Sequence, residues 1–199
     1  MKTTDTAAQA TNVTILFVDD EPIVIRAISR MVAQDTGFRV FTATSGAEAL
    51  GILRTWAVDV LVSDIDMPEM NGLELVRIAR RDFPSTLRIL LTGAVTMDRA
   101  LEAINEGEVV RIFTKPFELE TFTRTLSAFG ERILRLRRER HAEAQRERCE
   151  ELFRWIEERY PGTLDFERTE SNEVVIDVVQ LRARLSFAPP EVRALAGLP

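Results

Sequence analysis

The stretch VTILFVDDEP, residues 13–22, decides how this chain folds. Its first six residues are an apolar run broken only by one threonine, which is typical of a β-strand buried on both faces. The pair Asp19-Asp20 ends that run, and Pro22 stands where a helix would make its first turn. A buried strand that leads through acidic residues straight into a helix predicts the first part of a βαβ unit.

The same alternation continues as far as residue 113. Apolar runs of strand length are separated by segments in which apolar residues recur at helical spacing. After the second run, Ser45 stands as an N-cap with Glu48 at the capping-box spacing. We therefore predict an α/β protein with a five-stranded, parallel, doubly wound sheet and helices on both faces. The expected strands are 13–18, 38–43, 58–64, 87–92 and 109–113, and the expected helices follow Pro22 and Ser45 and span 71–82 and 96–106.

A long helix is predicted from Glu118 to about Tyr160, because this segment holds no proline and Gly130 is its single glycine. The stretch 137–148 inside it is dominated by Arg and Glu, whereas apolar residues recur at heptad-like spacings before and after that stretch. The apolar positions are Leu119, Phe122, Leu126, Phe129, Ile133 and Leu136 before it, and Cys149, Leu152, Phe153, Ile156 and Tyr160 after it.

Two interpretations of this helix remain open. A helix of this length extends beyond what is needed to cover a sheet, so its apolar seam favours a partner helix and a coiled-coil homodimer. Alternatively, the helix folds back on the tail of the same chain. The polar stretch 137–148 limits pairing to the two ends of the helix, and we expect Cys149 to be a buried small apolar residue rather than a redox sensor.

These patterns predict four segments. Residues 1–12 form a flexible N-terminus, residues 13–128 form the α/β domain, and residues 129–160 form the extended helix, a coiled-coil candidate. Residues 161–199 form a small C-terminal segment, in which TLDFER (163–168) and EVVIDVV (173–179) could pair as a β-hairpin.

Composition excludes several classes of protein. Of the 199 residues, 45% are hydrophobic and 29% charged, which is the balance of a globular domain, and no apolar run could cross a membrane. One cysteine, Cys149, rules out an intramolecular disulfide, and the single histidine, His141, rules out a Cys/His zinc cluster. The net charge of −6 argues against non-specific binding to nucleic acid or to an anionic membrane. We expect a cytoplasmic protein.

Residues with chemical potential gather at the carboxyl ends of the predicted strands, where ligands bind in parallel α/β sheets. These residues are Asp19 and Asp20 after the first strand, Asp64 at the end of the third, Thr92 at the end of the fourth and Lys115 just after the fifth. Three converging carboxylates repel one another unless a cation lies between them, and their hard oxygens suit Mg²⁺. A lysine and a hydroxyl opposite them can bind phosphoryl oxygens. The pattern predicts a phosphate-handling metal site.

The motifs FVDDE (17–21), SDIDMPEMNG (63–72), LLTG (90–93) and FTKPF (113–117) resemble, in that order, the receiver domain of two-component response regulators. The resemblance covers residues 13 to about 128 and implies a flavodoxin-like fold. It also implies that Asp64 accepts a phosphoryl group from a phosphohistidine on a sensor histidine kinase or phosphotransfer protein. By the same resemblance, Asp20 binds Mg²⁺ directly, Asp19 binds it through water, and the backbone carbonyl of Asp66 completes the protein ligands.

The remaining roles implied by the resemblance agree with general phosphoryl-transfer chemistry, in which positioning and charge neutralisation dominate. Lys115 compensates the charge of the transferred group, the hydroxyl of Thr92 senses its arrival, and Gly72 gives the loop after Pro68 conformational freedom. Beyond Mg²⁺-dependent phosphoryl transfer and slow self-dephosphorylation we expect no enzymatic activity, because residues 161–199 are too few for an ordinary catalytic domain.

Two residues depart from the family pattern. Receivers often carry Tyr or Phe three residues before the lysine, whereas this chain has Ile112 there, followed by Phe113. Either the aromatic switch is absent or the strand is offset by one residue. Asp66, two residues after Asp64, adds a carboxylate beside the site. We hypothesise that Asp66 alters the lifetime of the phosphoryl group, by orienting water or by repulsion.

Three functions follow from these observations. The first is a phosphorylatable response regulator that signals to an unidentified downstream protein by protein–protein contact, as a dimer. The second is a DNA- or RNA-binding regulator with its output in the C-terminal third, but residues 131–151 hold seven arginines and six glutamates, a mixed-charge surface rather than a basic one. The third is a Mg²⁺-dependent phosphohydrolase with Asp64 as nucleophile.

Overall fold

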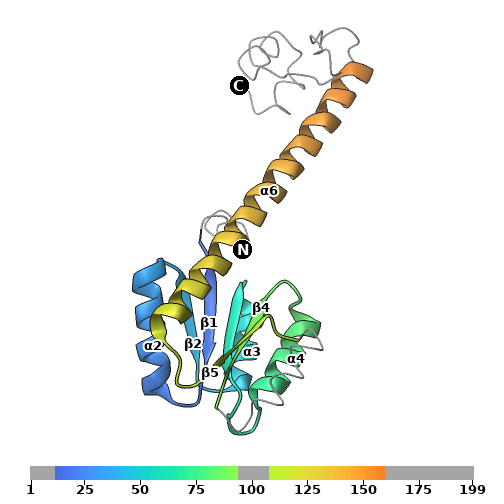
Figure 1. Ribbon diagram of the computed structural model, residues 1–199. Coiled ribbons are helices and arrows are strands. Elements are labelled where there is room, and N and C mark those ends of the chain that lie inside the picture. The colour runs from blue at the N-terminus through green and yellow to red at the C-terminus, as the bar shows by residue number, and fades with distance from the viewer. Residues whose placement is uncertain (1–11, 94–107, 160–199) are drawn as a thin grey trace. The chain divides into compact units, whose positions relative to one another are not determined.

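A parallel sheet forms the centre of the fold in the computed structural model, which describes residues 12–93 and 108–159. Strand β1 (Thr14–Val18) is buried along its whole length. All neighbouring strands are parallel, in the order β2-β1-β3-β4-β5 (Figure 1). The predicted five-stranded parallel sheet is therefore confirmed. The other strands are β2 (Arg39–Ala43), β3 (Val60–Asp64), β4 (Leu87–Thr92) and β5 (Arg111–Thr114).

The helices begin where the local sequence signals place them. Pro22 occupies the first turn of its helix, and the side chain of Ser45 accepts a hydrogen bond from the N–H of Glu48. Asn71 and Glu74 form a reciprocal capping box at the start of the next helix. The described helices are α2 (Pro22–Thr36), α3 (Gly46–Thr55), α4 (Gly72–Asp82) and α6 (Leu119–Arg159). The expected helix 96–106, the hairpin strands 163–168 and 173–179, and residues 1–11 lie outside the described residues.

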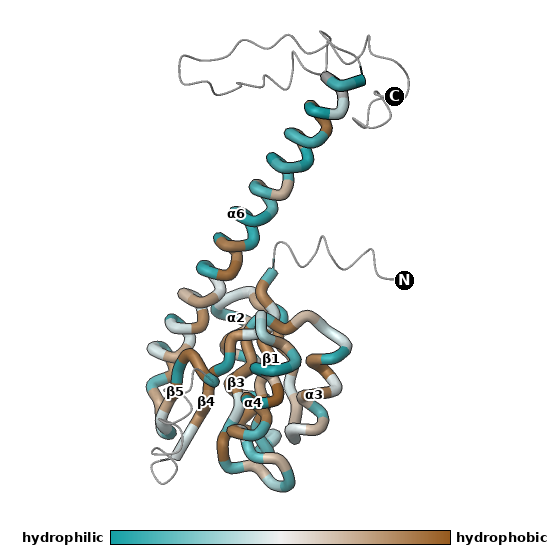
Figure 2. The backbone as a smooth tube through the Cα atoms, turned by 90° about the vertical axis from the view of Figure 1, so that its right-hand side faces the viewer, coloured by the Kyte–Doolittle hydropathy of each residue, from teal (hydrophilic) through white to brown (hydrophobic). Residues whose placement is uncertain are grey.

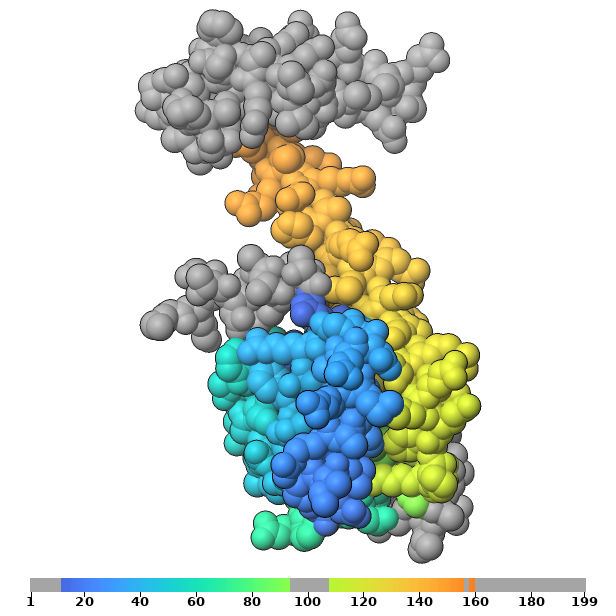
Figure 3. All heavy atoms as spheres, turned by 90° about the vertical axis from the view of Figure 1, so that its left-hand side faces the viewer, coloured from blue at the N-terminus to red at the C-terminus, as the bar shows by residue number. Residues whose placement is uncertain are grey.

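Two apolar cores lie on opposite faces of the sheet. Helices α3 and α4 pack on one face and contribute Leu50 and Leu75 to its core, whereas α2 and the first part of α6 pack on the other face. Figure 3 shows α2 and this part of α6 side by side. Because successive strand residues point to opposite faces, Leu16 and Phe17 of β1 enter different cores. This arrangement leaves the carboxyl ends of the strands free to carry polar groups.

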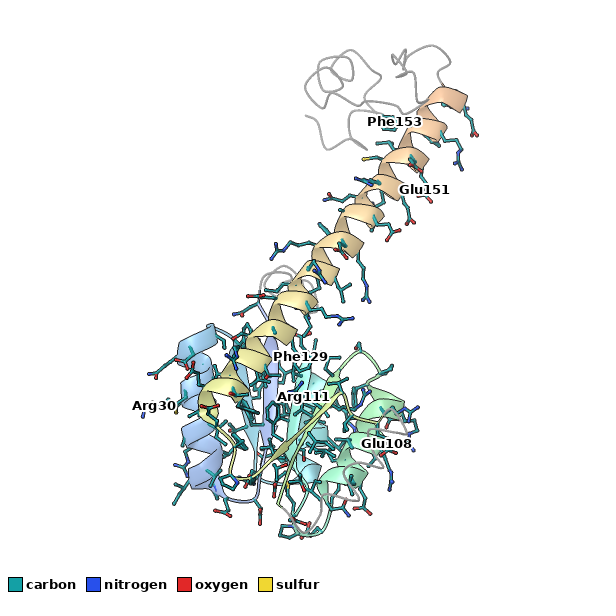
Figure 4. All side chains as sticks on the ribbon, viewed as in Figure 1. Arg30, Glu108, Arg111, Phe129, Glu151 and Phe153 are labelled. Atoms are coloured by element: carbon teal, nitrogen blue, oxygen red, sulfur yellow. The ribbon has the colours of Figure 1, made fainter. Side chains whose placement is uncertain are left out.

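The chain divides into two compact units, Met1–Arg138 and Glu139–Pro199. In the first unit, the apolar seam of α6 packs against the chain's own sheet: Phe122 and Leu126 are fully buried, and Phe129 lies over the sheet (Figure 4). Leu136 is the first seam residue that remains exposed. The part of the seam before residue 137 is thus largely used within the chain and not left for a partner helix.

The described part of the second unit is the remainder of α6. It is coloured mostly as hydrophilic in Figure 2. Every residue from Glu139 to Glu151 is exposed, including Cys149, so the expectation that this thiol is buried is wrong for the single chain. The described helix runs to Arg159, the last described residue, and the predicted end at about Tyr160 lies outside the described residues.

Candidate functional site

Three carboxylates meet at the carboxyl edge of the sheet. Asp19 and Asp20 follow β1, and Asp64 is the last residue of the adjacent strand β3. Each offers an oxygen that lies within 4.8 Å of the others. Asp19 and Asp64 are buried, with 3% and 6% of their surfaces exposed, whereas Asp20 is exposed. Because two of the carboxylates are buried and Asp20 is exposed, the cluster is open to solvent on the side of Asp20.

Lys115 closes the opposite side of this cluster. Its Nζ lies 2.8 Å from Oδ2 of Asp19 and 2.8 Å from Oδ1 of Asp64. Its backbone N–H donates to the carbonyl of Thr92 at 2.7 Å, which fixes the loop after β5 against the end of β4. Oδ1 of Asp19 accepts the N–H of Glu21 at 2.9 Å. Both oxygens of Asp19 therefore already accept a hydrogen bond, whereas Asp20 stands at the solvent side.

For the pKa values of Asp64 and Lys115, burial and the contact between the lysine and the carboxylate act in opposite directions. Burial raises the pKa of Asp64 above its usual 3.8, and the negative charges of Asp19 and Asp66 act in the same direction, although Lys115 lowers it. Burial lowers the pKa of Lys115, but its hydrogen bonds to Asp19 and Asp64 outweigh that effect, so the pKa lies above 10.5. The lysine is a fixed positive charge beside the carboxylates.

Thr92 and Asp66 lie at the same edge. In the β3–β4 register, Asp64 pairs with Leu91, so Thr92 is one residue beyond the partner of Asp64. Thr92 is fully buried, and its hydroxyl donates to the carbonyl of Gly93 at 2.9 Å. Asp66 is exposed in the loop after β3, where its charge acts on Asp64. The structure thus brings all six predicted site residues to one edge of the sheet.

Gly72 has a different role from the one expected. It is the first residue of α4 and not a flexible loop residue, and its N–H donates to the carbonyl of Ile65 at 3.0 Å. A Cβ on Gly72 would lie 2.0 Å from the backbone oxygen of Asp64. Only glycine allows this helix to begin so close to the backbone of Asp64, so Gly72 serves close packing rather than conformational freedom.

The position three residues before Lys115 is aliphatic, and β5 is not offset. Ile112 pairs with Leu90 and packs on the α3/α4 face, the face to which Thr92 also belongs by alternation along β4. Phe113 pairs with Leu91 and lies in the core beneath α6. The aromatic ring of β5 is therefore on the opposite side of the sheet from Thr92. Sequence alternation along RIFT would have indicated this side, once the register of Thr92 was known.

In the part of the chain that the structure describes, no helix is both long and apolar enough to cross a membrane.

Comparison with known proteins agrees with this geometry. Residues 15–127 match the family described as the response regulator receiver domain. Over 138 residues the chain is 30% identical to the sensor histidine kinase RcsC of Salmonella typhimurium, covering 69% of this chain and 14% of that protein. Over 116 residues it is 32% identical to the probable transcriptional regulatory protein TcrX of Mycobacterium tuberculosis, covering 58% and 49%. The chain spans less than half the length of either relative.

A solved structure gives the same result for the fold. The response regulator receiver domain protein from Clostridium thermocellum matches with a TM-score of 0.57 and 28% sequence identity, covering 62% of this chain and 98% of that chain. The similarity is thus to nearly all of a small domain and leaves more than a third of this chain unmatched.

Proposed function

The chain belongs to the response regulator receiver domain family, and we propose that Asp64 is its phosphoacceptor in a two-component phosphorelay. Receiver domains exchange phosphoryl groups with sensor histidine kinases and are phosphoacceptors rather than enzymes in the usual sense. One observation carries the assignment: Asp64 ends a central strand between two neighbouring carboxylates and a lysine whose Nζ is 2.8 Å from it.

The proposed transfer follows from the chemistry of these groups. A carboxylate oxygen of Asp64 forms a bond to phosphorus while the P–N bond of a phosphohistidine on the kinase or phosphotransfer protein breaks, and the imidazole leaves. Lys115 neutralises charge on the phosphoryl oxygens, and the Thr92 hydroxyl turns from the Gly93 carbonyl to donate its hydrogen bond to a phosphoryl oxygen. Because positioning and charge dominate such transfers, no further catalytic acid is needed.

The carboxylate cluster fits Mg²⁺. Oxygen ligands from Asp20 and Asp64, with the backbone carbonyl of Asp66, leave positions for water and phosphate, as Mg²⁺ prefers. Asp19 binds through water in this proposal, because both its oxygens already accept hydrogen bonds from Glu21 and Lys115. When bound, Mg²⁺ supplies positive charge between the carboxylates and the phosphoryl oxygens.

Phosphorylation by a small-molecule donor tests the assignment without knowledge of the cognate kinase. Wild-type protein incubated with acetyl phosphate and Mg²⁺ is expected to gain one phosphoryl group, measured as intact mass. Asp64→Asn is expected to gain none, while Glu69→Gln, an exposed acid in the same loop, behaves as wild type. Equal phosphorylation of Asp64→Asn, or none in wild type, would contradict the proposal. Continuous turnover of a small phosphate ester would favour the phosphohydrolase.

We further propose that the chain signals by protein–protein contact as a homodimer formed through the end of α6. The seam before residue 137 is largely occupied by the sheet of the same chain, which leaves the apolar positions around Leu152 as the candidate pairing surface. Cys149 is exposed there, three residues before Leu152, at the spacing of a heptad seam. The mixed Arg and Glu of residues 131–151 allow opposite charges to pair between two copies.

Light scattering tests this second proposal. Wild type and Asp64→Asn are measured with and without Mg²⁺ and beryllofluoride, a phosphoryl mimic. A dimer in every sample would make the helix a constitutive clamp, and a mass that rises only in wild type with the mimic would make phosphorylation the assembly switch. Leu152→Lys is expected to give a monomer, and Ala144→Lys, at an exposed position, serves as the matched control. A monomer in every wild-type sample would contradict the dimer.

A further inference from the structure

Four phenylalanine rings form a contiguous cluster between the sheet and α6. Phe122 of α6 is in its centre: its ring centroid lies 4.8 Å from that of Phe117, 4.9 Å from that of Phe113 and 6.2 Å from that of Phe17. The Phe113 and Phe117 centroids are 6.1 Å apart. Phe122 is fully buried, and Phe17 and Phe113 are nearly so. These distances are those of aromatic pairs in contact.

The same rings flank the residues of the phosphoryl site. Phe17 stands two residues before Asp19, Phe113 two residues before Lys115, and Phe117 two residues after it. Lys115 is held on one side by the two carboxylates and on the other by the backbone bond from its N–H to the Thr92 carbonyl. The next ring along the chain, Phe117, rests on α6. Lys115 is therefore two residues along the chain from a ring that contacts Phe122 in the first turn of α6.

Among residues 12–93 and 108–159, no comparable ring lies on the other side of β5 next to the site. The position there is Ile112, which packs with the α3/α4 core, and Phe113 turns its ring toward α6. The guanidinium carbon of Arg111, which Figure 4 labels, lies 5.6 Å from the Phe113 centroid. Within the described residues, the aromatic contacts near Lys115 thus lead to α6 alone.

We propose that Phe117 is a positioning residue of the phosphoryl site, coupling Lys115 to α6 through its ring contact with Phe122. This inference rests on the proposed function of Asp64. A phosphoryl group on Asp64 adds negative charge and oxygen acceptors where Lys115 now contacts the carboxylates, so Nζ must exchange partners. Only one residue separates Lys115 from Phe117, and the Phe117 ring packs on Phe122. A rearrangement of the lysine side chain therefore changes the packing at the start of α6.

Hydrogen exchange of the full chain measures this coupling. The readout is the change in amide protection over residues 119–138 of α6 when Mg²⁺ and beryllofluoride are added. Phe117→Leu removes the ring but keeps an apolar side chain, and Phe117→Tyr keeps the ring at this half-buried position. Phe41→Leu is the matched control: Phe41 is also half-buried and in ring contact with Trp56, but it packs with the opposite core.

We expect wild type, Phe117→Tyr and Phe41→Leu to show the same gain of protection in α6, and Phe117→Leu to lose at least about two-thirds of it, since loss of a ring contact changes an equilibrium by about threefold or more. Phosphorylation of Phe117→Leu by acetyl phosphate should continue at a lower rate. An unchanged α6 response in Phe117→Leu, an equal loss in Phe41→Leu, or no rescue by Phe117→Tyr would overturn the inference. A wild-type response that persists in Asp64→Asn would instead overturn the proposed phosphoacceptor.

Discussion

Gly130 of α6 lies directly against the ring of Phe38, the residue before strand β2. A Cβ on Gly130 would fall 2.2 Å from Cζ of Phe38, inside any allowed contact distance. Gly130 is also buried, so a side chain there could not escape toward solvent. The one glycine of the predicted long helix is therefore a packing requirement: it lets α6 approach the edge of the sheet closely.

The change Gly130→Ala is expected to lower the free energy of unfolding by about 1 kcal/mol, because the cost of overpacking exceeds the gain in helix propensity. Gly51→Ala provides the matched control. Gly51 is also inside a helix, but nothing lies within 4 Å of its Cβ position, so alanine there should stabilise by about 0.5–1 kcal/mol. Urea denaturation measures both. Equal stabilisation by the two substitutions would contradict the close packing of α6.

Arg137 ties α6 to the opposite end of the sheet from the phosphoryl site. Its guanidinium pairs with the carboxylate of Asp59 and donates to the carbonyl of Asn12 at 3.1 Å. Asp59 also accepts the N–H of Thr14 at 2.8 Å. Burial raises the pKa of Asp59 above its usual 3.8, while the Thr14 N–H and Arg137 lower it.

Removal of the Arg137–Asp59 ion pair is expected to lower the free energy of unfolding by an amount that depends on pH. Because the folded pKa of Asp59 is raised, its ionisation disfavours the fold at neutral pH, and Arg137 offsets that cost. Arg137→Gln raises the pKa further, so it should lower the free energy of unfolding by about 1–3 kcal/mol at neutral pH. The loss should shrink as the pH falls through the folded-state pKa of Asp59, which lies above 3.8, because a protonated carboxyl in the folded protein no longer needs the charge of Arg137.

Denaturation from neutral pH to about pH 4 measures the difference between wild type and variant. Arg138→Gln, at the adjacent exposed position, serves as the control and should change stability little at any pH. A loss in Arg137→Gln that is independent of pH would show that the arginine acts by packing rather than by its charge.

Removal of a single carboxylate tests the metal assignment. Mg²⁺ at about ten times its dissociation constant should stabilise wild type by about 1.4 kcal/mol, since it binds the folded state. Asp20→Asn should lose most of this stabilisation, because Asp20 is the exposed carboxylate of the cluster, while Glu21→Gln keeps it. Thermal unfolding with and without Mg²⁺ is the measurement. The same Mg²⁺-dependent shift in all three proteins would exclude Asp20 as a ligand.

Asp66 is expected to set the lifetime of the phosphoryl group. The residue is exposed and its charge already acts on Asp64. Asp66→Asn should change the rate constant of dephosphorylation by about threefold or more, as expected for loss of one positioned charge. A slower rate indicates that the carboxylate orients water, and a faster rate indicates repulsion. Phosphate release after removal of the donor gives the rate, and a rate equal to that of wild type would disprove the role.

The fold and the candidate site were largely predictable because they depend on local patterns. Buried strands such as 14–18 are recognisable in the sequence as apolar runs. The site carboxylates and Lys115 stand at or just after the carboxyl ends of such strands. Parallel topology alone then brings the ends of neighbouring strands to one edge. The order of the motifs completed the prediction for residues 13 to about 128.

Other contacts join residues that no local pattern connects. Asp59 and Arg137 are 78 positions apart, and neither stands in a motif. Arg88 appears inside an apolar strand, yet it is buried because its guanidinium donates to the carbonyls of Thr86 and Glu108. The seam of α6 looks like a coiled coil because the same spacing serves packing on a partner helix and packing on a sheet. Sequence periodicity cannot distinguish the two.

The most direct test of the central claim is to locate the phosphoryl group on the chain. Wild-type protein is phosphorylated with acetyl phosphate and Mg²⁺ and reduced with borohydride, which converts an aspartyl phosphate to homoserine, and the peptides are then sequenced by mass spectrometry. We predict homoserine at position 64 and nowhere else among the site carboxylates. Homoserine at position 19, 20 or 66, with an unmodified Asp64, would contradict the account.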